Sequence, residues 1–261
     1  GYMGLGDMAA KAAELSSTDP GVAPGADPLS AAMDVLRTAR ESGLSTALTA
    51  AVRHLDFITP CSDKGFCVLP GRMAPEIRGW LMAGRAVPGE RVTVRPGPRN
   101  ELAEREGLEV LQVVPREGLD EGLDDAAGPG PDPRERLALA GTLFAALRAG
   151  LAEVLLERAV AHVAGRRSGE RPLVERQLVR AKIADCVAAV RACELLLTTS
   201  GAAPYAAHEL HRRLDAADAA LTNLFGGAGY LADHPVRSLY VAAYVGSLWV
   251  APPQDPGQEW S

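Results

Sequence analysis

Lysine and aromatic residues are scarce in this sequence, and runs of positive charge are missing. Only 3 of the 27 basic residues are lysine, and aromatic residues make up 5% of the 261 positions. The formal net charge is −6 at neutral pH. Nucleic acids and anionic membranes attract clustered Lys and Arg, so the composition predicts neither as a partner.

Long apolar runs and paired cysteine motifs are also missing. Charged residues interrupt the apolar runs before they reach the roughly 20 residues that cross a bilayer, and the chain begins without a charged and then apolar export signal. The four cysteines, Cys61, Cys67, Cys186 and Cys193, lack the C-x-x-C spacing of zinc sites. We therefore expect a soluble protein of the reducing cytoplasm. Cys186 and Cys193 lie seven apart in a helical pattern, which favours core packing.

The histidines form no convincing metal motif. His208 and His211 lie three apart on a predicted helix, but no third ligand is spaced to complete a site. We interpret this pair as part of a solvated helical face and predict no metal. His54 and His162 are interpreted as isolated residues, and His234, which precedes a proline, as part of a helix start.

Apolar periodicity and turn residues divide the chain into segments. Residues 1–26 combine small residues, Pro and Gly without periodicity and predict a mobile lead-in. Residues 27–91 predict an N-terminal helical region, residues 92–131 a short β remnant with an acidic linker, residues 132–250 a helical bundle, and residues 251–261 a tail. The fold class is therefore mainly α, with two short strands.

Within residues 27–91 the pattern predicts three short helices. Two of them meet at Gly43, and the third lies near "APEIRGWLMAGR", residues 74–85. The stretches "RVTVRP" and "GLEVLQVV" predict two strands. A sheet usually needs three or more strands, so we expect this pair to lean on the helices.

The bundle shows the clearest periodicity in the chain. We predict helices over about residues 133–164, 172–199, 205–224 and 235–249. The third carries the apolar stripe Leu210, Leu214, Ala217, Leu221 and Leu224, whose 4-3-4-3 spacing buries one helix face against its neighbours.

Three stretches of the bundle resemble the C-terminal domain of the acyl-CoA dehydrogenase family. They are "RERLALAG", "GRRSGERPLVERQLVRAKIADCVAAVRACELLL", and "LFGGAGY" followed by "HPVRSLY". In order over roughly residues 132–250, they are more specific together than any one glycine motif alone. The resemblance implies an acyl-CoA-dehydrogenase-like four-helix bundle and FAD-linked α,β-dehydrogenation of an acyl thioester, carried by coenzyme A or a carrier protein.

The resemblance also implies cofactor-binding residues. Arg166 matches an arginine that contacts the FAD phosphates, and Asn223 stands where the family commonly has Gln. Gly226 and Gly227 match glycines whose backbone approaches the adenine end of a neighbouring subunit's FAD. Alternatively, Gly226 to Gly229 merely cap one helix and turn into the next. We expect a positive φ at Gly227, so that Gly227→Ala would cost folding stability.

Glu135 is the catalytic candidate that the resemblance implies, because some family members place their base at this position of the first bundle helix. The position used by many others holds Val250 here. Alternatively, Glu135 is only the third residue of a capping sequence that begins at Asp132 and Pro133.

Two departures from the family pattern weaken the flavin site. About forty residues stand where family members carry a whole β domain, and Gly169 and Glu170 replace a Phe-Gly pair, which adds negative charge near the phosphates. We therefore keep three functions open. The chain is a reduced dehydrogenase, a flavin-poor, non-catalytic or half-site partner of a full-length homologue, or a non-redox proton-transfer enzyme on an acyl thioester. A homo- or hetero-oligomer is expected.

Overall fold

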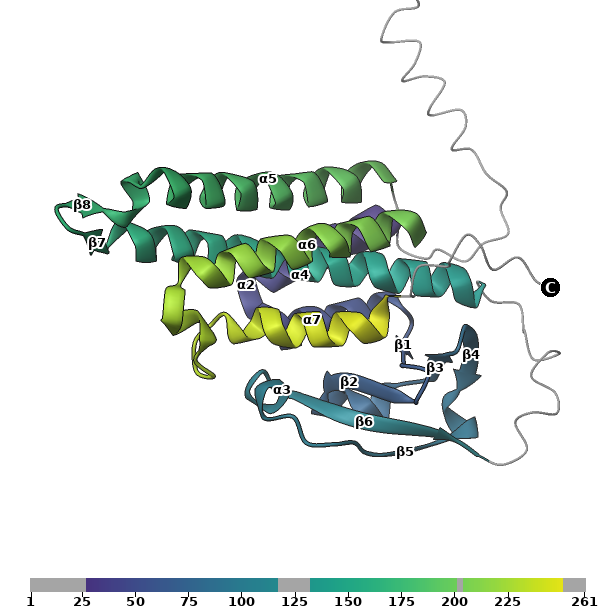
Figure 1. Cartoon of the computed structure of the whole chain (residues 1–261). Coiled ribbons are helices and arrows are strands. Elements are labelled where there is room, and N and C mark those ends of the chain that lie inside the picture. The colour runs from purple at the N-terminus through teal and green to yellow at the C-terminus, as the bar shows by residue number, and fades with distance from the viewer. Residues whose placement is uncertain (1–26, 117–131, 201–203, 251–261) are drawn as a thin grey trace, which may run out of the picture.

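A computed structural model describes residues 27–116, 132–200 and 204–250. The predicted lead-in, tail and most of the acidic linker lie outside the described residues. Five long helices lie over a smaller β region (Figure 1). The helices are α2 (Pro28–His54), α4 (Pro133–Ala164), α5 (Gln177–Ser200), α6 (Pro204–Leu224) and α7 (Arg237–Trp249). The prediction of a mainly α fold with a C-terminal four-helix bundle is confirmed.

The predicted meeting of two helices at Gly43 is also confirmed. Helix α2 is kinked there, because Gly43 has φ 78° and ψ −172°, outside the helical region. Asp27 caps the first half by accepting hydrogen bonds from the backbone N–H groups of Leu29 and Ser30.

The β region is larger than predicted, and the predicted third helix is wrong. Only a short 3-10 turn, Gly71–Glu76, lies at its start, and the strands begin at Ile58 rather than near residue 92. Trp80 is 1% exposed and faces Thr59 and Val87 across two strand pairings, so sheet pairing overrides the local helical pattern.

Two three-stranded sheets make up this region, in the orders β1-β3-β4 and β2-β6-β5. Their strands are β1 (Ile58–Pro60), β2 (Phe66–Pro70), β3 (Gly79–Met82), β4 (Arg85–Pro88), β5 (Val92–Pro96) and β6 (Leu108–Pro115), with the short helix α3 (Glu101–Arg105) before β6. The two predicted strands are β5 and β6, and they pair with each other. Arg237 of α7 joins this region to the bundle through a 2.7 Å ion pair with Glu106.

Helix α4 is the centre of the molecule. Every residue from Ala140 to Ala152 is buried, so the helix is covered on all sides along this stretch. By length and composition it is the one helix among the described residues that could cross a membrane, and 83% of its apolar window is buried inside the fold. Arg148 and Glu153 interrupt its apolar sequence, as expected, and the hydrophobic length of α4 forms the bundle core.

A buried charge cluster joins α4 to α6. Arg148 is 2% exposed, and its Nη2 donates to carboxylate oxygens of Asp215 and Asp218 at 2.7 Å each. Its Nη1 lies 3.1 Å from Nδ1 of His211, whose Nε2 lies 3.0 Å from the carbonyl oxygen of Gly141. His211 is therefore a core residue, and the prediction that it lies on a solvated face is wrong. It lies in the core because the buried guanidinium of Arg148 needs several acceptors.

Burial sets the protonation of this cluster. Loss of water raises the pKa of Asp218 to about 6, with the ion pair to Arg148 opposing the shift. Loss of water and the nearby Arg148 charge lower the pKa of His211 to about 4. With Nε2 protonated, the neutral ring donates to the Gly141 carbonyl and accepts from Arg148 at Nδ1.

We predict that Asp218→Asn changes the pH dependence of stability. Folded Asp218 keeps its proton up to a pKa of about 6, whereas an unfolded Asp loses it near 3.8, so this residue lowers stability as pH rises through that window. His211, with a pKa of about 4 when folded and 6.5 when unfolded, acts in the opposite direction. Relative to the parent protein, Asp218→Asn should therefore gain on the order of 3 kcal/mol between pH 4 and pH 7.

Urea denaturation at both pH values measures this difference. Asp215→Asn is the matched control, because its side chain is 65% exposed and pairs with the same arginine. Parallel stability curves for Asp218→Asn and the parent protein would contradict the assignment.

We also predict that Gly150→Ala destabilises the contact between α2 and α4. A Cβ at Gly150 would lie 2.4 Å from the backbone oxygen of Leu36 and 2.9 Å from Cβ of Ala39. Overpacking of this kind costs about 1–3 kcal/mol, more than the helix propensity that alanine adds. Gly165→Ala is the control, since its nearest contact is an ordinary 3.6 Å. Thermal denaturation should show a loss for Gly150→Ala alone.

Candidate functional site

The structure places the predicted site residues at two opposite ends of α4. Glu135 lies in the first turn, and Arg166 lies two residues beyond Ala164, the last residue of the helix. Because α4 has 32 residues, these ends lie ~48 Å apart at about 1.5 Å per residue. Asn223, Gly226 and Gly227, at the end of α6, lie on the Arg166 side (Figure 1). Four predicted residues thus share one end of the bundle, and Glu135 is not among them.

The shared end is built around Phe225, which follows α6. Its ring centroid lies 5.4 Å from that of His162 and 4.6 Å from that of His234, and we call these three residues the Phe225 cluster. Nε2 of His162 also lies 3.4 Å from Nη1 of Arg166. The cluster therefore connects the end of α4, the glycine turn and the start of α7.

Sequence reading missed this cluster, because His162 and His234 look isolated along the chain. The signal that could have revealed part of it is the i, i+4 spacing of His162 and Arg166 across a helix end. Burial and the neighbouring His162 lower the pKa of His234. Nδ1 of His234 also accepts from the N–H of Val236, the residue directly before α7, at 3.2 Å, and its predicted place at a helix start is confirmed.

The fold requires glycine at some positions of the glycine turn but not at others. Gly226 has φ +60°, a conformation that other residues adopt only with strain. A Cβ added at Gly229 would lie 2.8 Å from the carbonyl oxygen of Thr222, so the packing requires glycine there. Gly227 has no positive φ, and a Cβ there would meet no atom of the described residues within 4 Å. The expected positive φ at Gly227 is therefore wrong, because Gly226 makes the turn instead. The fold itself gives no reason for glycine at 227.

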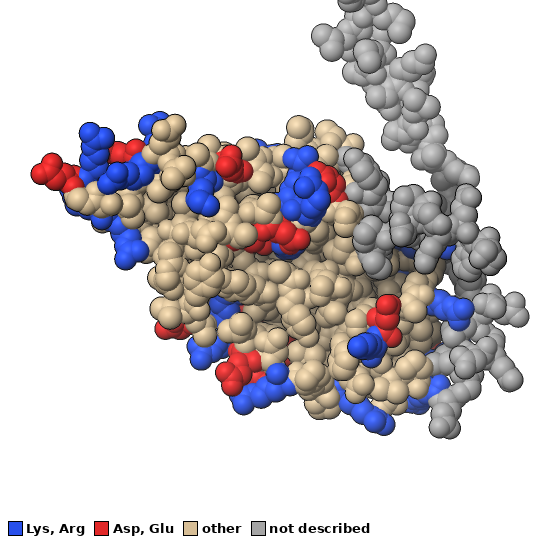
Figure 2. Space-filling view, viewed as in Figure 1, with Lys and Arg blue, Asp and Glu red and all other residues tan. Residues whose placement is uncertain are grey.

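The polar groups of this end face solvent. Asn223 is exposed, and its Oδ1 accepts from the Tyr230 hydroxyl at 3.3 Å. Arg166 is exposed beside the hairpin of β7 (Arg167–Ser168) and β8 (Arg171–Pro172). Figure 2 shows charged side chains crowded at the tip that this hairpin forms. Arg176 supports the hairpin by donating to the Ser168 carbonyl at 2.9 Å.

Glu135 lies in a different environment at the far end of α4. Asp132 caps the helix by accepting from the N–H of Arg134 at 2.9 Å, so the predicted cap is confirmed. Glu135 itself is exposed and makes no hydrogen bond within the described residues. Base catalysis at a carbon acid needs a carboxylate in a dry pocket, and the described part of this chain does not enclose Glu135.

Near Glu135 the backbone makes an unusual turn. Asp56 and Phe57 have consecutive positive φ values of 55° and 60°. Arg136 faces this turn, with Nη1 3.5 Å from the Leu55 carbonyl and 3.9 Å from Oδ2 of Asp56. Arg78 adds a contact 5.3 Å from the Phe57 ring centre. These contacts fix α2 and the β region against the start of α4.

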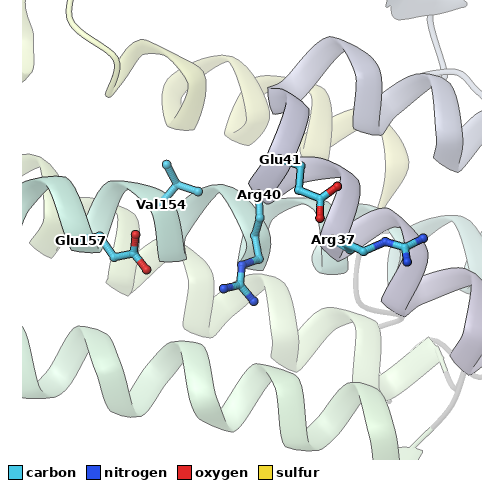
Figure 3. Close-up of a pocket in the computed structure, with 5 residues that line it drawn as sticks. All are labelled: Arg37, Arg40, Glu41, Val154 and Glu157. Atoms are coloured by element: carbon cyan, nitrogen blue, oxygen red, sulfur yellow. The ribbon is translucent and has the colours of Figure 1, made fainter.

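A cavity of about 420 Å³ lies elsewhere, between α2 and α4 (Figure 3). Its lining residues are Arg37, Arg40, Glu41, Val154 and Glu157. Two positive and two negative side chains cancel each other, so the cavity has no charge preference for a ligand. It contains none of the predicted site residues.

We predict that the two adjacent glycines respond differently to alanine. Gly226→Ala should cost about 1 kcal/mol or more of folding stability, because alanine is strained at positive φ. Gly227→Ala should keep the stability of the parent protein within about 0.5 kcal/mol. Urea denaturation of both variants measures the difference. Equal losses at both positions would show that the turn is not centred on Gly226.

Comparisons with known proteins match the bundle to a known domain. Residues 133–249 match the family model "Acyl-CoA dehydrogenase, C-terminal domain". No curated protein matches the chain significantly.

Several solved structures also match. A glutaryl-coenzyme A dehydrogenase in complex with glutaryl-CoA is 20% identical over 62% of this chain and 45% of its own, with a TM-score of 0.45. Butyryl-CoA dehydrogenase from Megasphaera elsdenii is 18% identical over 63% and 46%, with a TM-score of 0.47. The ChsE4-ChsE5 complex from Mycobacterium tuberculosis is 18% identical over 66% and 51%, with a TM-score of 0.49. The chain thus spans about half the length of these proteins.

Proposed function

Because residues 133–249 are an acyl-CoA dehydrogenase C-terminal domain, we propose that this chain acts on an acyl thioester by the family's FAD-linked α,β-dehydrogenation. The acyl group would be carried by coenzyme A or by a carrier protein. We propose that the active unit contains more than one chain, either copies of this chain or this chain with a full-length homologue. The four free thiols support a cytoplasmic location.

The observation that carries this proposal is the separation of the two half-sites. Glu135 and Arg166 lie at opposite ends of a 32-residue helix, ~48 Å apart. One dinucleotide is too short to reach both. A neighbouring chain therefore has to supply what each end lacks, which is the cover over Glu135 at one end and the flavin cradle at the other.

The glycine-turn end fits the adenine and phosphate part of FAD. Gly227 offers open backbone with no structural reason to lack a side chain, as a ligand that approaches the main chain requires. Arg166 presents an exposed guanidinium for phosphate, and Asn223 an exposed amide. Glu170, also exposed, opposes anion binding and weakens the site. FAD, when bound, supplies the hydride acceptor.

At the other end, Glu135 is the base that would take the α-proton of the thioester. Its position in the first turn of α4 presents the carboxylate at the exposed N-terminal end of the helix. The neighbouring chain would exclude water from the carboxylate and so strengthen it as a base.

A second function remains supported by one observation. Glu135 is exposed and no described cleft adjoins it, as expected if this chain supplies only the Gly227 end to a catalytic full-length homologue. A non-redox proton transfer on an acyl thioester is the third candidate, and it would proceed without flavin.

Flavin content of the assembled protein tests the proposal. We expect the oligomer, formed by this chain alone or with a full-length homologue, to retain FAD with its visible absorption. Gly227→Val should lower FAD retention at least tenfold without loss of stability, because the side chain fills the ligand's space. Ala232→Val, exposed in the same loop, is the control. An oligomer that remains colourless with excess FAD would exclude the flavin reaction.

Turnover of the assembled protein tests Glu135. Glu135→Gln keeps the size of the side chain and removes the base, so we expect activity to fall about 10²- to 10⁴-fold. The melting temperature should not change, because the carboxylate makes no hydrogen bond in the described chain. The neighbouring Arg134→Gln variant is the control. Unchanged turnover with retained flavin would leave the chain as the half-site partner.

A further inference from the structure

Cys61 and Cys67 flank a tight turn at the start of β2. The N–H of Ser62 donates to the carbonyl of Phe66 at 2.8 Å, and the N–H of Gly65 donates to the carbonyl of Ser62 at 2.8 Å. The Phe66 N–H is held by the Ser62 hydroxyl at 3.0 Å. Ser62 and Phe66 therefore close the turn, and Cys61 and Cys67 are the next residues outward on its two sides.

This pairing places the two cysteines opposite each other. The Cys61 N–H is used elsewhere, by the Leu81 carbonyl at 2.9 Å, so the two cysteines form a pair without mutual backbone hydrogen bonds. In such pairs the Cα atoms lie about 4.5 Å apart and the side chains share one face, which is within the range that a disulfide spans. Both thiols are buried, and the Cys67 thiol is the largest cause of the raised pKa of Cys61, as expected of neighbouring thiols.

From this geometry we propose that Cys61 and Cys67 are a site of oxidative modification, at which a hydroperoxide joins the two thiols in an intramolecular disulfide. One thiolate attacks the O–O bond of hydrogen peroxide and forms a sulfenic acid with loss of hydroxide, which takes up the released proton as water. The second thiol displaces the sulfenic oxygen as a second water. Two thiols and one peroxide thus give one disulfide and two waters. The inference does not depend on the proposed function.

Burial explains why the pair stays reduced without an oxidant. Contact with Cys67 and loss of water raise the pKa of the Cys61 thiol well above its ordinary value, so little thiolate is present at neutral pH. The exposed turn residues Asp63 and Lys64 lie directly beside the pair, and a small oxidant such as peroxide needs only a local opening there.

The other two cysteines provide an internal control. Cys186 and Cys193 lie seven residues apart on α5, a rise of about 10.5 Å along the helix. Their thiols point to different backbone carbonyls, those of Ala217 and Leu210, each at 3.9 Å. They cannot join each other without unfolding the helix, so a disulfide formed in the folded chain identifies the Cys61 pair.

Peptide mapping of the full chain tests the proposal. The folded protein is treated with hydrogen peroxide, the remaining thiols are blocked, and the chain is cut with trypsin. Lys64 lies between the two cysteines, so trypsin separates residues 54–64 from residues 65–72 unless a disulfide holds them. We expect these two peptides as one linked species that separates on reduction, with a mass two hydrogens below the sum of the free thiol forms.

Two variants complete the test. The double variant Cys186→Ser with Cys193→Ser should give the same linked species, and Cys61→Ser should give none. Recovery of residues 54–64 and 65–72 as separate blocked peptides would overturn the proposal. So would sulfinic acid at either cysteine, or a bond from either one to Cys186 or Cys193.

Discussion

The burial of α4 on all sides is the constraint on which the rest of the structure depends. A helix whose whole circumference is buried along such a stretch has no face left for water, so every neighbour has to cover part of it. Helix α2 covers one side, and the close approach at Gly150 allows its backbone to do so. Helix α6 covers another, where Arg148 has to be neutralised and supplied with acceptors. The packing of both neighbours is thus fixed by the sequence of α4.

The length of the same helix determines how function can be arranged. A core helix of 32 residues puts its two termini on opposite faces of the molecule, and each terminus carries one set of candidate site residues. The Phe225 cluster stabilises one terminus, and the Asp56–Phe57 turn with Arg136 braces the other. Each end is held by side-chain contacts but open to solvent. Such an arrangement suits residues that act on a ligand shared between chains.

Much of the bundle could be predicted from the sequence because its signals are local. Asp132 and Pro133 mark the start of α4, and Gly43 marks the kink of α2, each by its own conformational preference. The β region could not be predicted in this way. Trp80 lies in a pattern that is locally helical, and only its partners on β1 and β4 make it a strand residue.

The site shows the same limit at single residues. His211 reads as a surface histidine until Arg148, 63 positions away, is placed beside it. The resemblance assigned Arg166, Asn223 and the two glycines to one cofactor, and the structure places them at one end of the bundle. Neither motif nor spacing showed that Gly226 rather than Gly227 makes the turn. That difference depends on one backbone angle, which two adjacent glycines leave undetermined in the sequence.

The order of elements along the chain has a consequence for synthesis. Helix α2 precedes α4, so one covering surface exists when α4 leaves the ribosome, whereas α5, α6 and α7 are still to be made. During that interval the remaining sides of an apolar helix long enough to cross a bilayer face water. The nascent chain at this stage is the form most open to aggregation and to capture by chaperones, and premature termination after α4 leaves a fragment that cannot bury its own core.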